Sequence, residues 1–322
     1  MFSVINEFDV NSAKTIHIYD MLLKIINETN SKFVNINKLV ENKGNIKNYL
    51  IATYNCLPVF YITFYGIASL EPIIDELSSL LKIILINEDI HHSRRIATGR
   101  IKPYLKSYYS FNTSGYQLNR WNLPNVQNNY YFPHSARWIL DINNNPINKV
   151  LLSGANSDIY PDRLYAINLK HPKTEVLKKL KDTDKNASYG INFYKQLNKY
   201  ICCFVDTARD YTLAKIFEIC GAGSLLLCMN TNIIDIFEQL GFIDGENYIA
   251  CTRDNLIEKI EYITNPDNLE EINKIKLNGQ NLIKEKHNWE YRYKIFLDVL
   301  AGKFVGKKHR NDKYGTDYYL GF

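Results

Sequence analysis

A lysine and a glutamate three residues apart stand out in the segment Asp210–Leu227, DYTLAKIFEICGAGSLLL. Residues three apart are neighbours on a helix surface, so Lys215 and Glu218 should share one helical face. The Glu218 carboxylate could accept two hydroxyl hydrogen bonds, as a ribose diol requires, and the Lys215 ammonium could neutralise a phosphate. The N-terminus of the helix would add unpaired N–H groups. The alternative is an ordinary amphipathic helix with a solvated ion pair.

Another candidate phosphate site follows the apolar run Lys149–Leu152. Ser153 and Gly154 come directly after this predicted strand, and Pro161 opens a predicted helix that carries Arg163. A glycine at the end of a strand lets the backbone approach a diphosphate, and a guanidinium can bind phosphate oxygens bidentately. The alternative is a common strand–turn–helix junction.

An acidic and histidine-rich cluster follows a third apolar run, Lys82–Asn87. Asp89, His91 and His92 lie in the polar loop after this predicted strand, at the end where a parallel sheet binds ligands. Adjacent carboxylates and imidazoles could orient a substrate hydroxyl or relay its proton. The alternative is a solvated polar loop.

Two of these segments resemble a known family. Lys215–Leu227, KIFEICGAGSLLL, resembles the donor-binding signature of GT-B glycosyltransferases, above all the K/R-x-F-E-x-x-A/G-x-G-x-L-L pattern of the CgeB-like, spore-protein glycosyltransferase group. In the wider family two acidic residues stand eight apart. Glu218 takes the second position, and Asp210 takes the first, where much of the family has Glu. The Ser153–Gly154 turn with Tyr160-Pro-Asp-Arg163 is similar to the group's Ser-Gly turn and Y-P-x-R pattern.

The resemblance implies an α/β, GT-B-like fold with two Rossmann-like domains facing each other across a cleft. It implies a metal-independent, hexosyltransferase-like enzyme that uses a nucleotide-diphospho-sugar as donor substrate, without a cofactor, and a glycan or glycoprotein as acceptor. The implied donor site is Ser153, Gly154, Arg163, Asp210, Lys215, Glu218 and Gly223. The implied catalytic residues are Asp89, His91 and His92, with His134 as a further candidate near the donor phosphate. Because Asp210 departs from the family's Glu, an inactive nucleotide-sugar-binding or glycan-binding protein is the alternative.

The elements that must position these residues alternate between strands and helices, which predicts parallel sheets covered on both faces. In the second half, predicted strands at 149–153, 200–205, 224–228 and 247–251 alternate with predicted helices. The polar linker DINNNPIN, residues 141–148, predicts a domain boundary. We therefore expect an acceptor-side domain at 1–145, a nucleotide-sugar-binding domain at 146–302 and a tail at 303–322 with no assigned function. The last helix could pack back on the N-terminal half.

Composition excludes several classes of protein. The net charge of +5 suits anionic small molecules and falls short of a nucleic-acid-binding stripe. The apolar stretch Leu57–Leu70 is too interrupted to span a membrane. The six cysteines form no C-x-x-C pair, which predicts buried, reduced thiols and a cytoplasmic location. The abundance of Ile and Asn suggests an AT-rich parasite or large DNA virus as the source, and the host cytoplasm in the viral case.

Rival enzyme motifs are weak or absent. Asp182 and Asp184 form a D-x-D, which holds a divalent cation in GT-A glycosyltransferases, but they lie in a charged loop and do not follow a hydrophobic strand. We therefore predict no metal site. The sequence has no G-x-G-x-x-G after its strand at 149–153 and no G-x-S-x-G elbow, which disfavours a dinucleotide-binding dehydrogenase and a serine hydrolase.

Overall fold

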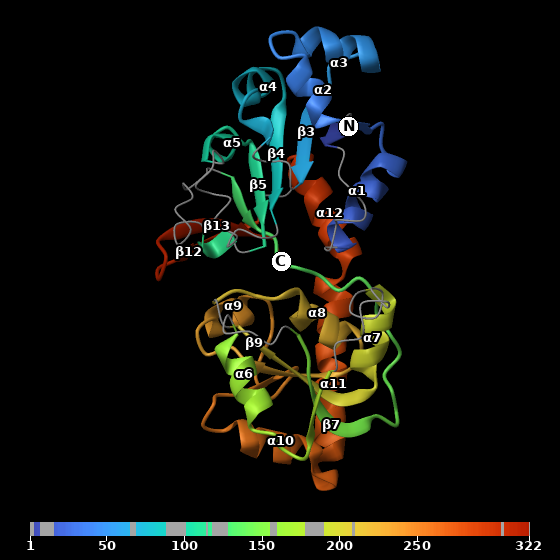
Figure 1. Cartoon of the computed structure of the whole chain (residues 1–322), viewed down its shortest axis with the longest axis vertical. Coiled ribbons are helices and arrows are strands. Elements are labelled where there is room, and N and C mark those ends of the chain that lie inside the picture. The colour runs from blue at the N-terminus through green and yellow to red at the C-terminus, as the bar shows by residue number, and fades with distance from the viewer. Residues whose placement is uncertain are drawn as a thin grey trace. The chain divides into compact units, whose positions relative to one another are not determined.

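The computed structural model describes residues 3–6, 16–64, 69–87, 101–113, 115–117, 128–154, 160–177, 190–207, 210–303 and 306–321. The chain forms two compact units, each with its own sheet (Figure 1). The N-terminal unit comprises Met1–Pro133 and Tyr293–Phe322, and the C-terminal unit comprises His134–Arg292. Within the described part of the chain, no helix is both long and apolar enough to cross a membrane.

The N-terminal unit contains an eight-stranded sheet in the order β12-β13-β6-β5-β4-β3-β1-β2. All neighbouring pairs are parallel except β12 and β13, which form an antiparallel hairpin. The strands are β1 (Ser3–Asn6), β2 (Lys32–Val34), β3 (Phe60–Phe64), β4 (Lys82–Asn87), β5 (Tyr109–Asn112), β6 (Asn129–Tyr131), β12 (Lys307–Asn311) and β13 (Thr316–Leu320). The helices of this part of the chain are α1 (Ile16–Glu28), α2 (Ile36–Glu41), α3 (Ile46–Tyr54), α4 (Ile74–Leu80) and α5 (Ile101–Leu105).

The C-terminal unit contains a five-stranded, fully parallel sheet in the order β11-β10-β9-β7-β8. Its strands are β7 (Ile147–Leu152), β8 (Thr174–Val176), β9 (Tyr200–Asp206), β10 (Leu225–Met229) and β11 (Ile249–Ala250). Its helices are α6 (Pro161–Asn168), α7 (Gly190–Asn198), α8 (Ala214–Gly221), α9 (Ile234–Gln239), α10 (Leu256–Thr264), the short η4 (Pro266–Asn268), α11 (Leu269–Leu282) and the π-helical η5 (Ile283–His287). Every residue of β9 and β10 is buried, as expected of strands covered on both faces.

The two sheets share one strand order. In the N-terminal sheet β2 lies on one side of β1 and β3 on the other, and in the C-terminal sheet β8 and β9 flank β7 in the same way. The direction of winding therefore reverses between β1 and β3 in the N-terminal unit and between β7 and β9 in the C-terminal unit. Doubly wound sheets bind ligands outside the carboxyl ends of their strands at such a switch point. In the C-terminal unit this point lies where Leu152 and Asp206 end their strands.

The boundaries between the units differ from those expected from the polar linker. The first boundary follows Pro133 and not residue 145, because the segment after Pro133 is bonded to the C-terminal unit. The N–H of Ala136 donates to the carbonyl of His287, and that of Leu140 donates to the carbonyl of Gly221. The polar character of DINNNPIN thus marks a surface segment of the C-terminal unit.

The last helix, α12 (Trp289–Leu300), returns to the N-terminal unit from Tyr293 onward, which confirms the prediction that it packs back on that half. Its Tyr293 Oη donates to Glu28 Oε2 at 2.6 Å, and the rings of Phe296 and Phe111 lie 4.8 Å apart. Residues 303–322, expected to be a tail, contribute the β12–β13 hairpin that extends the sheet beyond β6.

The cysteines follow the prediction with one exception. Cys202, Cys203, Cys220, Cys228 and Cys251 are buried free thiols, and burial raises the pKa of each. Cys56, which follows the left-handed ending of α3 at Asn55, is exposed and does not fit the prediction.

Candidate functional site

Three residues predicted to bind phosphate meet at the switch point of the C-terminal sheet. Gly154 follows β7 with a φ of +120°, which favours glycine. A β-carbon added there would lie 2.5 Å from Arg163 Nη1 and 2.7 Å from Lys215 Nζ. Two cations therefore converge directly on the Gly154 backbone, from α6 and from the first turn of α8. Such a concave cationic turn suits a diphosphate.

Asp206, the last residue of β9, holds Arg163 in place. Its Oδ1 lies 2.7 Å from Arg163 Nη2, and its Oδ2 accepts a hydrogen bond from the backbone N–H of Arg163 at 3.1 Å. The side chains of Arg163 and Asp206 are only 4% and 0% exposed. One carboxylate thus orients the guanidinium and satisfies an N–H in the first turn of α6. Asp206 was not among the residues predicted from the sequence. The feature that points to it is an acidic residue directly after the apolar run Tyr200–Val205, at the carboxyl end of a predicted strand.

Lys215 brings the other cation to the turn. Its Nζ donates to the carbonyl oxygen of Ser153 at 2.9 Å and lies 5.8 Å from the centre of the Phe193 ring. Lys215 forms no ion pair with any residue that the structure describes. Burial, and then the nearby Arg163 cation, hold the pKa of Lys215 below its usual range. Lys215 is therefore a partly buried cation at the turn after β7, where its charge suits an anionic ligand.

Glu218 lies one turn farther along α8 and is partly buried. Burial raises the pKa of this carboxyl, and the Lys215 cation opposes the rise. The charge of Glu218 also helps to raise the pKa of Tyr194, after the larger effect of burial. Among the described residues, none donates a hydrogen bond to the Glu218 carboxylate. Its oxygens therefore have free capacity to accept hydrogen bonds from a ligand.

The remaining predicted donor residues differ in placement. Ser153 is buried, and its Oγ has no hydrogen-bond partner in the described part of the chain. Asp210 stands in the turn between β9 and α8 with a left-handed φ of 53°, and its N–H donates to the carbonyl of Thr207 at 2.8 Å. His134 is buried and is the first residue of the C-terminal unit.

Gly223 follows the C-terminal end of α8, whereas Lys215 lies in the first turn of that helix. With a φ of +75°, it forms the left-handed ending of the helix, where Ser224 N–H donates to the carbonyl of Ile219. A β-carbon on Gly223 would lie 3.1 Å from Gln280 Nε2 and 3.2 Å from Ile142 Cα. Helix termination and close packing thus account for this glycine, and the structure does not place it with Lys215 and Arg163.

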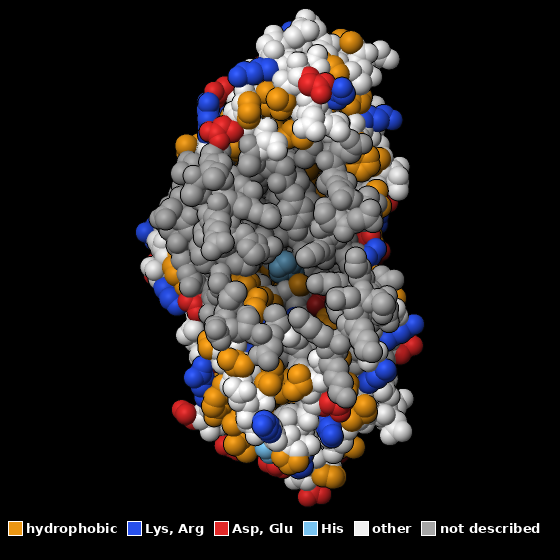
Figure 2. Space-filling model, viewed as in Figure 1, with side chains coloured by type: hydrophobic (Ala, Val, Ile, Leu, Met, Phe, Trp, Pro, Cys, Tyr) orange, Lys and Arg blue, Asp and Glu red, His pale blue; other side chains and the backbone are white. Residues whose placement is uncertain are grey.

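The predicted catalytic residues Asp89, His91 and His92 lie outside the described residues, as do Asp182 and Asp184 of the D-x-D. In the ranges that the structure describes, no three His, Cys, Asp or Glu side chains form a group that could hold a metal ion. On the face in Figure 2, basic and acidic side chains are interspersed among those drawn in colour.

Comparison with known proteins identifies the fold. No protein-family model and no curated protein matches the sequence. The structure is similar to that of HepE from Anabaena in complex with UDP and glucose, with a TM-score of 0.58 and 9% identity over 94% of this chain and 100% of that one. It is also similar to a glycosyltransferase from Rickettsia africae, with a TM-score of 0.54 and 12% identity over 94% and 98% of the two chains.

A protein from Listeria monocytogenes assigned as a UDP-N-acetylglucosamine 2-epimerase has a TM-score of 0.51 and 12% identity over 94% of this chain and 96% of that one. At sequence identities this low, the similarity supports a shared fold and nothing further. The chain therefore has the GT-B fold, with two Rossmann-like α/β domains, as expected from the sequence.

Proposed function

We propose that this chain is a glycosyltransferase that moves a sugar from a nucleotide-diphospho-sugar to a glycan or protein acceptor. The observation that carries the proposal is the convergence of Arg163 and Lys215 on the Gly154 turn at the switch point of the C-terminal sheet. The Ser153 Oγ, which has no hydrogen-bond partner among the described residues, and the Glu218 carboxylate add hydrogen-bonding groups beside them. The names of two structurally similar proteins, a glycosyltransferase and a complex with UDP and glucose, support the same donor class.

In the proposed reaction an acceptor oxygen forms a bond to the anomeric carbon of the sugar. The bond from that carbon to the diphosphate oxygen breaks, and the diphosphate leaves with the electron pair. Arg163 and Lys215, held in place before the reaction, would stabilise the negative charge that develops on the leaving group. Glu218 would hold the ribose of the nucleotide.

The acceptor-side chemistry is proposed for Asp89, His91 and His92, which follow β4 in the sequence. One of these groups would take the proton of the acceptor hydroxyl. Three further points stay predictions from the sequence: that the chain is a CgeB-like hexosyltransferase, that Asp210 contacts the donor directly, and that the protein is viral and acts in the host cytoplasm.

The test is to incubate the full chain with UDP-glucose and candidate acceptors and to measure UDP release and glycosylated product. Acceptor-dependent release of UDP is the expected result. Binding of UDP-glucose without turnover on any acceptor would favour the alternative, a GT-B protein that binds nucleotide sugars. Conversion of UDP-N-acetylglucosamine to its 2-epimer without an acceptor would contradict transfer.

Replacing Glu218 by alanine is expected to weaken UDP binding by about 1.5–3 kcal/mol, because hydrogen bonds from the ribose hydroxyls to a carboxylate are lost. Isothermal titration with UDP measures the change. Glu258→Ala removes an exposed glutamate from α10 and serves as the matched control. Equal UDP affinity in a folded Glu218→Ala protein would rule out the ribose assignment.

Transfer is expected to proceed without a divalent metal, because Arg163 and Lys215 already supply two positive charges at the turn after β7. The initial rate should therefore be unchanged after treatment with EDTA. Loss of transfer in EDTA, restored by Mn²⁺, would contradict this expectation and would direct attention to Asp182 and Asp184.

A further inference from the structure

A pocket of about 480 Å³ opens in the C-terminal unit away from the Gly154 turn. Its walls come from the segment before β7, the start of β9, the η4 turn and helix α11. It lies at the amino ends of β7 and β9, whereas Gly154 follows the carboxyl end of β7. The six residues of β7 separate the two places by roughly 17 Å at the usual rise of a strand. The volume suits a monosaccharide-sized ligand.

Lys276 of α11 lines this pocket and is only 3% exposed. It forms no hydrogen bond and no ion pair with the residues that the structure describes. Burial lowers its pKa, and no neighbouring charge contributes to the shift. A buried ammonium without a partner is unfavourable, and an anion bound in the pocket would relieve that cost.

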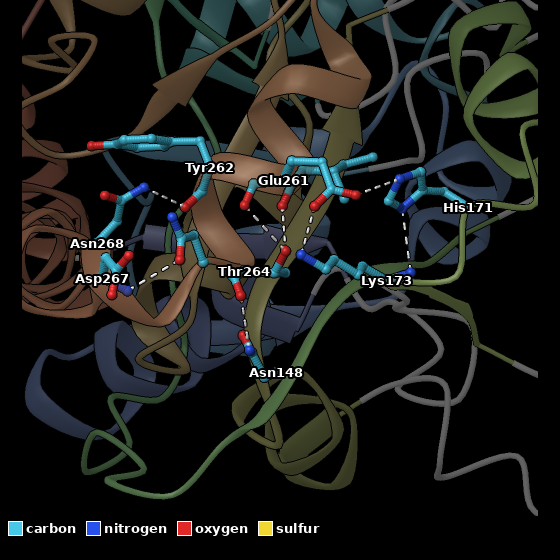
Figure 3. Close-up of polar contacts among 10 residues, drawn as sticks. Asn148, His171, Lys173, Glu261, Tyr262, Thr264, Asp267 and Asn268 are labelled. Carbon is cyan, nitrogen blue, oxygen red and sulfur yellow. Dashed lines mark hydrogen bonds and ion pairs between the residues drawn. The ribbon is translucent and has the colours of Figure 1, made fainter.

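Neither glutamate of the adjoining helix α10 supplies that partner: Glu258 is exposed, and Glu261 is engaged elsewhere. Glu261 Oε1 lies 3.0 Å from His171 Nε2, and Glu261 Oε2 lies 2.5 Å from Lys173 Nζ (Figure 3). The Glu261 carboxylate is thus engaged by His171 and Lys173.

The neighbouring polar contacts hold the pocket wall in a fixed shape. Asn148 Nδ2 donates to the carbonyl of Thr264 at 2.9 Å, which ties the start of β7 to the end of α10 (Figure 3). Asn268 Nδ2 donates to the carbonyl of Tyr262 at 3.0 Å across the η4 turn. The site therefore exists before a ligand arrives.

Three asparagines share the lining of the pocket with Lys276. Asn144, Asn145 and Asn273 line the pocket, and their side chains form no hydrogen bond with any described residue. Each amide offers donors and acceptors that match sugar hydroxyls, and Pro146 and Leu277 supply apolar surface for C–H faces. We propose that this pocket binds a small polyhydroxylated anion, with its phosphate or carboxylate at Lys276 and its hydroxyls on the asparagine amides.

The experiment measures binding of glucose 6-phosphate, glucuronate, glucose and inorganic phosphate to the full chain by titration calorimetry. Either glucose 6-phosphate or glucuronate should bind at least tenfold more tightly than glucose and inorganic phosphate do. Whichever of these two sugar anions binds more tightly shows whether the site prefers a phosphate or a carboxylate. Lys276→Met should weaken that binding at least tenfold, as expected when a charge-assisted contact is lost. Lys274→Met, which changes an exposed lysine of the same helix, should leave it unchanged.

Two further measurements separate this site from the proposed donor site and from a folding defect. Lys215→Ala should bind the sugar anion as the parent does, whatever happens to UDP. Lys276→Met should unfold at a higher temperature than the parent without ligand, because it removes an unpaired buried charge. The proposal is overturned if no sugar anion binds saturably at millimolar concentrations. It is equally overturned if glucose or phosphate alone binds as tightly, or if binding persists in Lys276→Met.

Discussion

Replacing Lys215 by alanine is expected to lower the kcat of sugar transfer by about 10²–10³-fold, the usual effect of removing one preorganised group that stabilises charge in the transition state. Lys215 Nζ is placed by its hydrogen bond to the Ser153 carbonyl and lies against the Gly154 backbone. Arg163 is paired with Asp206, so Lys215 is the cation with the larger uncompensated charge at the turn. Steady-state kinetics with UDP-glucose measure the loss.

The control for this prediction is Lys195→Ala, which removes an exposed lysine from α7. The control should keep the parental kcat. A Lys215→Ala protein that binds UDP and transfers sugar at the parental rate would show that the leaving diphosphate is stabilised by other groups.

Lys215 should also set the alkaline limit of UDP binding. It is cationic below its pKa, and burial together with Arg163 places that pKa below the ordinary lysine value. UDP affinity should therefore fall as the pH rises through the lowered pKa. The guanidinium of a Lys215→Arg protein stays charged over this range, so the fall should move to higher pH. An identical pH profile in both proteins would assign the limit to another group.

Replacing Asp206 by alanine is expected to lower the free energy of unfolding of the C-terminal unit by about 3–5 kcal/mol, because it leaves the guanidinium of Arg163 buried without its carboxylate. The Arg163 and Asp206 side chains are 4% and 0% exposed, so water cannot replace the lost partner. The N–H of Arg163 also loses its acceptor at the start of α6. Urea denaturation followed by circular dichroism measures the change.

The double variant Arg163→Met/Asp206→Ala tests the cause. Removing both charges leaves neither member of this ion pair buried without the other, so the double variant should be more stable than Asp206→Ala alone. If the double variant is as unstable as the single one, the loss comes from packing or from the α6 N–H and not from the unpaired guanidinium.

Much of the C-terminal unit could be predicted from local patterns. The apolar runs at 149–153, 200–205 and 224–228 became β7, β9 and β10, since strands buried on both faces need continuous apolar residues. The helix with Lys215 and Glu218 on one face is α8, and its left-handed ending falls at Gly223. Three short elements, the helices α2 and α3 and the strand β8, could not be predicted, because their residues show too weak a periodicity.

The sequence by itself determined which residue types the candidate donor site would use. Gly154 after a strand, Arg163 after a helix-opening proline, and Lys215 and Glu218 three apart are all local features, set by backbone freedom and helical spacing. Only the tertiary structure decided which of them meet and what else joins them. Asp206 reaches Arg163 across 43 positions of the chain, and Asn129 Nδ2 donates to the carbonyl of Asp317 across 188 positions to hold the C-terminal hairpin in the N-terminal sheet. Such pairings depend on strand order and winding, which come from packing the whole chain and leave no pattern in a short stretch of sequence.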